Sequence, residues 1–342
     1  MKLGKYVLGV AAVAFLAGMA GGGCSNRSET PTTGAKTDGK VTIGVMPKLV
    51  GIPFFNAFEK GALEAGKEAG VEVVYDGPVT ADTAKQVSIV ESWIARKFDA
   101  IVIAPNDPDA IAPVLQKARS RGIKVITADA DAKPSDREFF VSQATPQAIA
   151  RALVDTMVKG IGPDGKFVIL TGSLTAANQN IWMEEMEKYR QEKYPNMKNL
   201  SPTPKTSEED QALATQVAID LLKTYPEMQG LYAITSVALP GAAEALRKEK
   251  AADKIYLTGL ATPNSMKEYV KGGEVREFVL WNPTDLGYLA VATAKAVLDG
   301  KLTPETKEFE AGRIGKVSVS DGVVLLGDPL IFNKDNIDDF DF

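Results

Sequence analysis

Short apolar runs alternate with amphipathic stretches along most of the chain. The run 41–46 is rich in β-branched residues and stops at Pro47, and the stretch 55–69 repeats its apolar positions at helical spacing. Such pairs recur about ten times, so strands and helices are expected to alternate. The predicted strands are 41–46, 71–75, 100–104, 124–127, 139–142, 166–170, 200–203, 230–234, 254–258 and 277–281. The predicted helices are 55–69, 83–97, 108–121, 146–159, 180–194, 207–224, 238–250, 265–271 and 285–299.

The predicted strands are short and continuously apolar, which is typical of parallel strands covered by helices on both faces. The pattern therefore predicts an α/β protein with two doubly wound parallel sheets of about five strands each. A single sheet of about ten strands is the alternative architecture. Beyond Lys301 the pattern changes to short extended pieces at 316–320 and 323–326, which predict a tail packed along the outside.

The N-terminus carries a leader that ends at Cys24, the only cysteine of the chain. A short basic start precedes an apolar stretch, 6–20, and the glycines 21–23, an order typical of an export signal. A cysteine directly after small residues resembles the bacterial lipoprotein signal, so we expect residues 1–23 to be removed and Cys24 to be lipidated. Ordinary cleavage with an unmodified cysteine is the alternative. Residues 24–40 are polar, small and aperiodic, which predicts a flexible tether.

The composition narrows the possible chemistry. The 342 residues carry a formal net charge of -5 and include no histidine. Ser-His-Asp and Cys-His catalytic arrangements are therefore impossible, and a single cysteine cannot build a thiolate zinc site. A mildly acidic chain without long basic runs is not built to bind nucleic acid. Composition leaves paired-carboxylate chemistry open, but no such pair stands out, so an enzyme is the less expected class. We expect no cofactor and no metal.

Polar side chains follow nearly every predicted strand. In open α/β sheets, ligands bind outside the carboxyl ends of the strands, so these side chains are candidates for one site. Carboxylates, amides and a lysine together suit a small polyhydroxylated ligand, and aromatic rings can face the C–H side of a sugar. Alternatively, such residues are ordinary turn and cap residues, as we expect for Asp109 and Ser207. The candidates are Lys48, Asn106, Asp107, Asp129, Asp131, Gln143, Ser173, Asn178, Gln179, Thr235, Ser236 and Asn282, with the aromatic residues Phe54, Phe55, Trp182 and Trp281.

Seven longer segments share features with one known family: 47–51, 75–78, 106–110, 178–182, 281–288, 311–316 and 332–338. Together they resemble the type I periplasmic sugar-binding proteins of ABC importers, the class related to ribose-binding protein. The resemblance runs from Val41 to the C-terminus and is strongest to the branch that contains the rhamnose-binding and autoinducer-2-binding proteins.

The resemblance implies a set of ligand-binding residues. Aspartates usual in the autoinducer-2-binding proteins are replaced here by Asn178, Thr235 and Asn282, and the surrounding segments are more similar to the rhamnose-binding side. The positions that match ligand-binding residues of the autoinducer-2-binding proteins are Lys48, Asp129, Gln179, Pro240 and Ala242. The complete set of expected ligand-binding residues is Lys48, Phe54, Phe55, Asp107, Asp129, Asn178, Gln179, Thr235, Pro240, Ala242 and Asn282.

The resemblance also implies how the chain is organised. Residues 41–143 and 261–308 would form lobe 1, and residues 144–260 and 309–342 would form lobe 2 with the C-terminal tail. The ligand would bind between the lobes and draw them together. A three-stranded hinge would cross between the lobes near Gln143, Gly259 and Glu308.

The implied function is that of a monomeric, lipid-anchored solute-binding protein in the periplasm or on the cell surface. It would deliver a rhamnose-like sugar to the membrane permease of an ABC importer, and the lipid would be its only attachment to the membrane. An autoinducer-2-binding protein of the same fold and a sensor that presents its closed form to a membrane receptor are alternatives. A glycosidase is a further alternative, in which Asp107 and Asp129 would flank the bond that is cleaved.

Overall fold

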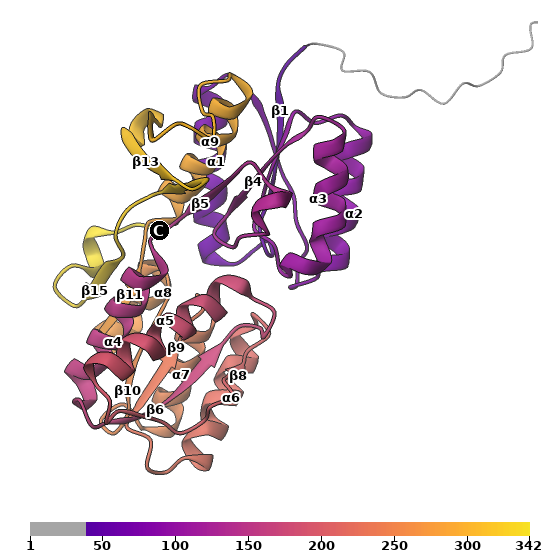
Figure 1. Ribbon diagram of the computed structural model, residues 1–342. Helices are drawn as coiled ribbons and strands as arrows, with labels where there is room; N and C mark the ends of the chain where they lie inside the picture. The colour runs from indigo at the N-terminus through magenta and orange to yellow at the C-terminus, as the bar shows by residue number, and fades with distance from the viewer. Residues whose placement is uncertain (1–38) are drawn as a thin grey trace, which may run out of the picture. The chain divides into compact units, whose positions relative to one another are not determined.

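The computed structural model describes residues 39–342, drawn in colour in Figure 1. The predicted leader 1–23, the predicted lipidation site Cys24 and residues 25–38 of the predicted tether lie outside the described residues. Within residues 39–342, no helix is both long enough and apolar enough to cross a membrane.

The first sheet is built on five parallel strands in the order β2-β1-β3-β4-β5. The interior strands are almost fully buried, which explains why they appear in the sequence as continuous apolar runs. Their bounds lie within one residue of the predicted strands at each end. The strands are β1 (Thr42–Met46), β2 (Glu72–Tyr75), β3 (Ala100–Ile103), β4 (Lys124–Ala128) and β5 (Phe139–Ser142).

Helices cover both faces of this sheet (Figure 1). Helices α1 and α9 pack on one face, and α2 and α3 pack on the other. Alternating residues of β1 face the two layers, since Ile43 and Val45 belong to the core with α1, whereas Met46 belongs to the core with α2. The helices are α1 (Pro53–Glu68), α2 (Thr83–Ala95), α3 (Pro108–Ser120) and α9 (Pro283–Leu298).

The second sheet is also parallel and has the order β10-β9-β6-β7, with the short β8 on the same side of β6 as β7. Two helix pairs, α4 with α5 and α6 with α7, pack in this part of the chain (Figure 1). The strands are β6 (Lys166–Thr171), β7 (Lys198–Asn199), β8 (Lys205–Thr206), β9 (Gly230–Ala233) and β10 (Tyr256–Gly259). The helices are α4 (Pro146–Ile161), α5 (Ala177–Lys193), α6 (Gln211–Thr224), α7 (Ala238–Glu249) and α8 (Pro263–Gly272).

The strands form two separate parallel sheets, so the predicted α/β architecture is confirmed and the alternative of one large sheet is wrong. In the first sheet β1 lies between β2 and β3, and in the second sheet β6 lies between β7 and β9. The strands that follow β1 and β6 along the chain therefore lie on both sides of them. This change of direction creates a topological switch point at the carboxyl end of β1 and another at the carboxyl end of β6. These two switch points are where side chains of the candidate site are expected to meet.

The C-terminal strands join the sheets differently from the predicted tail. Strand β14 pairs in parallel with β5, β13 pairs antiparallel with β14, and β12 pairs antiparallel with β13 at the edge of the first sheet. Only β15 lies elsewhere, paired antiparallel with β11. The prediction that 309–342 belong with lobe 2 is therefore wrong for β13 and β14. The strands are β11 (Glu277–Leu280), β12 (Glu308–Glu310), β13 (Lys316–Ser320), β14 (Val323–Leu325) and β15 (Leu330–Asn333).

The segment before α9 also differs from the predicted boundaries. Helix α8 packs against α7, and Val279 of β11 bridges in parallel to Leu260, directly after β10. Residues 261–280 thus pack beside the second sheet, although the prediction placed them in lobe 1. Their hydrophobic pattern suits either sheet, because each offers an apolar layer, and the choice depends on contacts distant in sequence. Short 3₁₀ turns complete the described chain at Pro134–Asp136, Gly312–Ile314 and Ile337–Asp339.

Candidate functional site

Lys48 connects the two switch points. It lies two residues after β1, its side chain is 4% exposed, and its Nζ donates a 2.8 Å hydrogen bond to Asn178 Oδ1 in the first turn of α5. The loop that carries Lys48 is fixed from behind, since Asn106 Nδ2 donates to the Lys48 carbonyl at 2.8 Å. Buried Gln86 completes this support by donating to the Pro47 carbonyl at 3.1 Å. A lysine held in this way is positioned to donate to a bound molecule.

Asp129 is a second buried charged residue of the site. It follows β4 with φ of 65°, in the left-handed region, and its side chain is 5% exposed. Asn178 Nδ2 donates to the Asp129 carbonyl and to its Oδ2, both at 3.3 Å. Burial raises the pKa of Asp129 to about 6, against the opposing charge of Lys48. The negative charge of Glu209 raises the same pKa further, and the hydrogen bond from Asn178 lowers it.

Gln179 and Glu209 form the floor on the side of the second sheet. The Gln179 Oε1 accepts from the Gly172 backbone N–H at 2.8 Å and from the Thr171 hydroxyl. Its Nε2 donates at 2.8 Å to Glu209 Oε1, while the Thr235 hydroxyl donates to Glu209 Oε2. The buried Glu209 is thereby held by groups that follow β6 and β9, the two strands at the second switch point.

Aromatic rings wall the same cavity. The ring of Phe54 lies edge-on to Phe55 at 5.0 Å and to Trp281 at 6.1 Å, and Trp281 lies 5.6 Å from Trp182. The Trp281 Nε1 is buried and has no hydrogen-bond partner. The enclosed volume is about 40 Å³, and we call this space the cleft cavity. Its lining residues are Lys48, Ile52, Phe54, Phe55, Asp129, Asn178, Gln179, Trp182, Glu209, Ile234, Thr235, Ser236, Leu260, Leu280 and Trp281.

Most predicted ligand-binding residues meet in the cleft cavity, and four do not. Asp107 caps α3, where its Oδ1 accepts from the backbone N–H groups of Asp109 and Ala110. Asn282 caps α9 in the same way, and both residues are therefore occupied at helix N-termini. Pro240 and Ala242 are buried within α7, outside the lining of the cavity. The predicted residues that line the cavity are Lys48, Phe54, Phe55, Asp129, Asn178, Gln179 and Thr235.

Two predicted helix caps lie elsewhere. The N-cap of α3 is Asp107 and not Asp109, and the N-cap of α6 is Asp210 and not Ser207. Glu209, which the sequence reasoning did not select, precedes that cap and lines the cavity. Its only sequence signal is an acidic run before a helix, which is equally typical of an exposed helix start.

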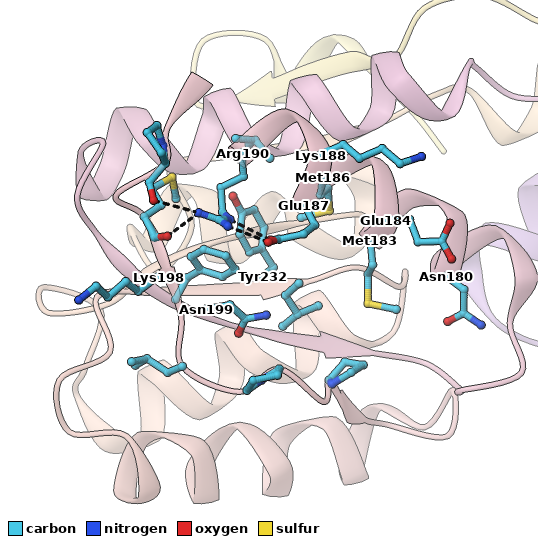
Figure 2. A pocket seen from close by; sticks show the side chains of 18 of the residues that line it. Asn180, Met183, Glu184, Met186, Glu187, Lys188, Arg190, Lys198, Asn199 and Tyr232 are labelled. Atoms are coloured by element: carbon cyan, nitrogen blue, oxygen red, sulfur yellow. Dashed lines mark hydrogen bonds and ion pairs between the residues drawn. The ribbon is translucent and has the colours of Figure 1, made fainter. Parts of the chain in front are cut away.

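A second and larger cavity lies beside α5 (Figure 2). It encloses about 1260 Å³ and is walled by apolar side chains such as Phe167, Met183 and Met186. Figure 2 shows Arg190 at its rim, where the guanidinium pairs with Glu187 at 2.7 Å. Unlike the cleft cavity, this space has no cluster of buried charged side chains, so it does not resemble a site for a polyhydroxylated ligand. Among residues 39–342, no cluster of acidic side chains is arranged to hold a metal ion.

Comparisons with known proteins show which family this chain resembles. The periplasmic binding protein domain family matches residues 43–302 of this chain. The ribose import binding protein of Bacillus subtilis is 25% identical over 268 residues, which cover 78% of this chain and 84% of that protein. The D-ribose/D-allose-binding protein of Pseudomonas aeruginosa is 27% identical and covers 82% of this chain and 89% of its own length.

Solved structures give the same result. LsrB from Clostridium saccharobutylicum, in complex with AI-2, is 31% identical with a TM-score of 0.84, over 88% of this chain and 100% of that chain. A solute-binding protein from Clostridium phytofermentas with bound L-rhamnose is 27% identical with a TM-score of 0.83, over 88% of this chain and 98% of that chain. These relatives are binding proteins of transporters, which confirms the expectation that the chain is not an enzyme. The chain belongs to the periplasmic binding protein family and has the type I fold of that family.

Proposed function

We propose that the chain is the extracytoplasmic solute-binding protein of an ABC importer and that it binds a small sugar in the cleft cavity. The observation that supports this most strongly is the composition of the cavity. Buried charged and amide groups, Lys48, Asp129, Asn178 and Glu209, line the cavity together with aromatic rings in edge-on contact. Sugar hydroxyls can donate to the carboxylates and accept from the lysine, while the rings cover the C–H faces of the sugar.

Entry of a sugar requires the two sheets to move apart. Pockets that hold small molecules usually enclose about 300–1,000 Å³, whereas the cleft cavity encloses about 40 Å³. The bond between Lys48 and Asn178 closes the space directly, so a ligand must replace it. The connections between the two sheets, 143–145, 281–282 and 326–329, would serve as the hinge, in place of the predicted crossings near Gly259 and Glu308. Contacts of the ligand with both sides would then favour the closed form.

A rhamnose-like sugar is the ligand that we favour. The segments 178–182 and 281–288 resemble the rhamnose-binding branch, and the aspartates usual in autoinducer-2-binding proteins are replaced here by Asn178, Thr235 and Asn282. The L-rhamnose complex has nearly the same TM-score as the AI-2 complex. Autoinducer-2 is the second candidate, because the 31% identical relative binds it and Lys48, Asp129 and Gln179 all line the cavity. The closed protein would deliver its ligand to a membrane permease as a monomer.

The leader would place this function at a membrane surface. We expect lipidation of Cys24 to hold the protein in the periplasm or on the cell surface through the tether 24–40. Mass spectrometry of the mature N-terminus tests this directly: a diacylglycerol mass on Cys24 is expected. An unmodified N-terminus beginning elsewhere would contradict the anchor without affecting the sugar-binding proposal.

Calorimetric titration tests the ligand. The mature protein is titrated with L-rhamnose, D-ribose, D-galactose and autoinducer-2, and one-to-one binding of L-rhamnose with the highest affinity is expected. Tighter binding of autoinducer-2 would select the second candidate. Absence of binding to all four compounds would overturn the sugar-binding proposal.

A further inference from the structure

Glu209 is a buried carboxylate at the floor of the cleft cavity, although its neighbours in sequence are exposed. Its side chain is 9% exposed, whereas Glu208 and Asp210 are open to solvent. The Glu208 backbone N–H donates to the Gly172 carbonyl at 2.8 Å, which fixes this turn against the end of β6. Glu208 and Glu209 both adopt left-handed backbone angles, with φ of 49° and 56°, which residues with side chains rarely adopt. This geometry turns one carboxylate of the acidic run inward.

The surroundings of Glu209 hold its carboxylate in one orientation. Each carboxylate oxygen receives one donor, Gln179 Nε2 on one side and the Thr235 hydroxyl on the other. Gly172 leaves the necessary room, because a Cβ there would lie 2.0 Å from Glu209 Oε1. A carboxylate oxygen can accept two hydrogen bonds, so each oxygen of Glu209 keeps capacity for a further donor.

The charges of the cavity are unbalanced. Its lining includes the two carboxylates of Asp129 and Glu209 but only one ammonium, that of Lys48. The bond from Lys48 goes to the neutral amide of Asn178. Electrostatic interactions are strong in a buried site, so an anionic ligand would meet net repulsion there. Neutral hydroxyl groups would instead donate to the carboxylates and offset the cost of burying them.

The cavity wall also includes a residue whose hydrogen-bond donor has no partner. The indole N–H of Trp281 is buried without a partner at the wall of the cavity, and buried donors normally have one. A ligand that both donates hydroxyls and offers a neutral acceptor oxygen would satisfy the carboxylates and the indole together. An uncharged polyol or sugar has both kinds of group.

We propose that Glu209 binds the ligand directly and that, together with Asp129, it restricts the site to uncharged polyhydroxylated molecules and rejects sugar acids. This inference rests on the proposed sugar-binding function and defines the charge of the ligand. Glu209 thereby supplies a carboxylate beside Gln179 and Thr235.

The test compares neutral and anionic sugars in matched variants. The wild-type protein, Glu209→Gln and Glu209→Asp are titrated with L-rhamnose, D-ribose, D-galactose and D-galacturonate. Glutamine keeps the size of the side chain and can still accept from Gln179 and donate to the Thr235 oxygen, while aspartate keeps the charge. Glu208→Gln is the control, because it neutralises an exposed carboxylate one residue away. Thermal unfolding measures whether each variant is folded.

We expect the wild type to bind its best neutral sugar at least about 100-fold more tightly than galacturonate. Glu209→Gln is expected to lose about 10- to 100-fold in affinity for the neutral sugar and to narrow the preference over galacturonate by about tenfold or more. Glu209→Asp should bind the neutral sugar more weakly but keep the preference, and Glu208→Gln should match the wild type.

The possible failures are distinguishable. If the wild type binds none of the neutral sugars, the proposed function fails, and this inference fails with it. If the wild type binds a neutral sugar and Glu209→Gln binds it equally well, only the role of Glu209 is overturned. Equal affinity of the wild type for galacturonate and for its best neutral sugar would overturn the charge selection, and this measurement requires no variant.

Discussion

The ammonium of Lys48 and the amide of Asn178 form a 2.8 Å hydrogen bond between residues 130 positions apart in the chain. Lys48 follows β1, the strand at the switch point of the first sheet, and Asn178 lies in the helix that follows β6, the strand at the switch point of the second sheet. A single pair therefore joins the two switch points at which doubly wound sheets bind their ligands.

Lys48→Ala tests the contribution of this ammonium to binding. We expect a loss of about 2–3 kcal/mol in affinity for the sugar, because charge-assisted hydrogen bonds contribute energies of this size. Calorimetry measures the loss, and Lys60→Ala on the exposed side of α1 is the control. An affinity equal to that of the wild type would remove Lys48 from the binding site.

The stability of the protein should depend on pH through Asp129. Its pKa is raised to about 6 from an ordinary value of 3.8, so the folded state binds this proton more tightly than the unfolded state does. The stabilisation by the protonated form is fully present below about pH 4 and is lost as the pH rises through about 6. Because one pKa unit corresponds to about 1.4 kcal/mol, ionised Asp129 destabilises the fold by roughly 3 kcal/mol at neutral pH.

Asp129→Asn should remove this dependence. Urea unfolding between pH 4 and pH 8 is expected to show a variant that matches the wild type at low pH and exceeds its stability at neutral pH. The exposed Asp253→Asn serves as the control and should follow the wild-type curve. Parallel curves for the wild type and Asp129→Asn would show that the buried carboxylate has no raised pKa.

Gly172→Ala should disturb the site without touching a ligand. The added methyl would lie 2.0 Å from Glu209 Oε1 and 2.5 Å from its Cδ, so the carboxylate must move. We expect a loss of about 1–3 kcal/mol in stability, typical of an overpacked core, together with weaker sugar binding. Gly327→Ala is the matched control, since no heavy atom lies within 4 Å of a Cβ placed there. Unchanged binding and stability in Gly172→Ala would mean that the Glu209 side chain has free space.

Tryptophan fluorescence should report ligand binding. Of the three tryptophans, Trp182 and Trp281 line the cleft cavity, whereas Trp93, in α2, stacks on Phe98. Addition of the sugar is expected to change the emission of the wild type and of Trp93→Phe to the same extent. The change in emission should be much smaller in Trp281→Phe, because this substitution replaces the fluorescent indole ring and its N–H at the cavity wall by a phenyl ring. A signal that depends on Trp93 instead would place the ligand outside the cavity.

Local patterns in the sequence were sufficient to predict most of the parallel strands and the helices between them; the exception is the predicted strand 200–203, which is a loop between the short β7 and β8. The strand β1, for example, is buried on both faces, and such burial forces a continuous apolar run. The same reasoning selected Lys48 and Asp129, since polar residues that follow buried parallel strands lie at the carboxyl ends of those strands, where ligands bind.

Other features depend on contacts that no local pattern contains. Asp107 and Asp129 both follow strands, yet one caps a helix and the other enters the cavity, because a left-handed backbone angle redirects Asp129. Glu209 differs from Glu208 only through contacts with Gly172, Gln179 and Thr235. Strand β14 pairs with β5 across about half of the chain, and its three residues alone do not specify that partner.

The pairing of β14 with β5 also limits how early the first sheet can be completed as the chain is synthesised. The first sheet begins with β1 near residue 42, but β5 stays an unprotected edge until the last tenth of the chain is present to cover it. Helix α9, which packs against α1, also lies late in the chain, so α1 remains without this partner until then. A sheet that cannot be completed before residue 325 depends on contacts distant in sequence, and such contacts make folding slow.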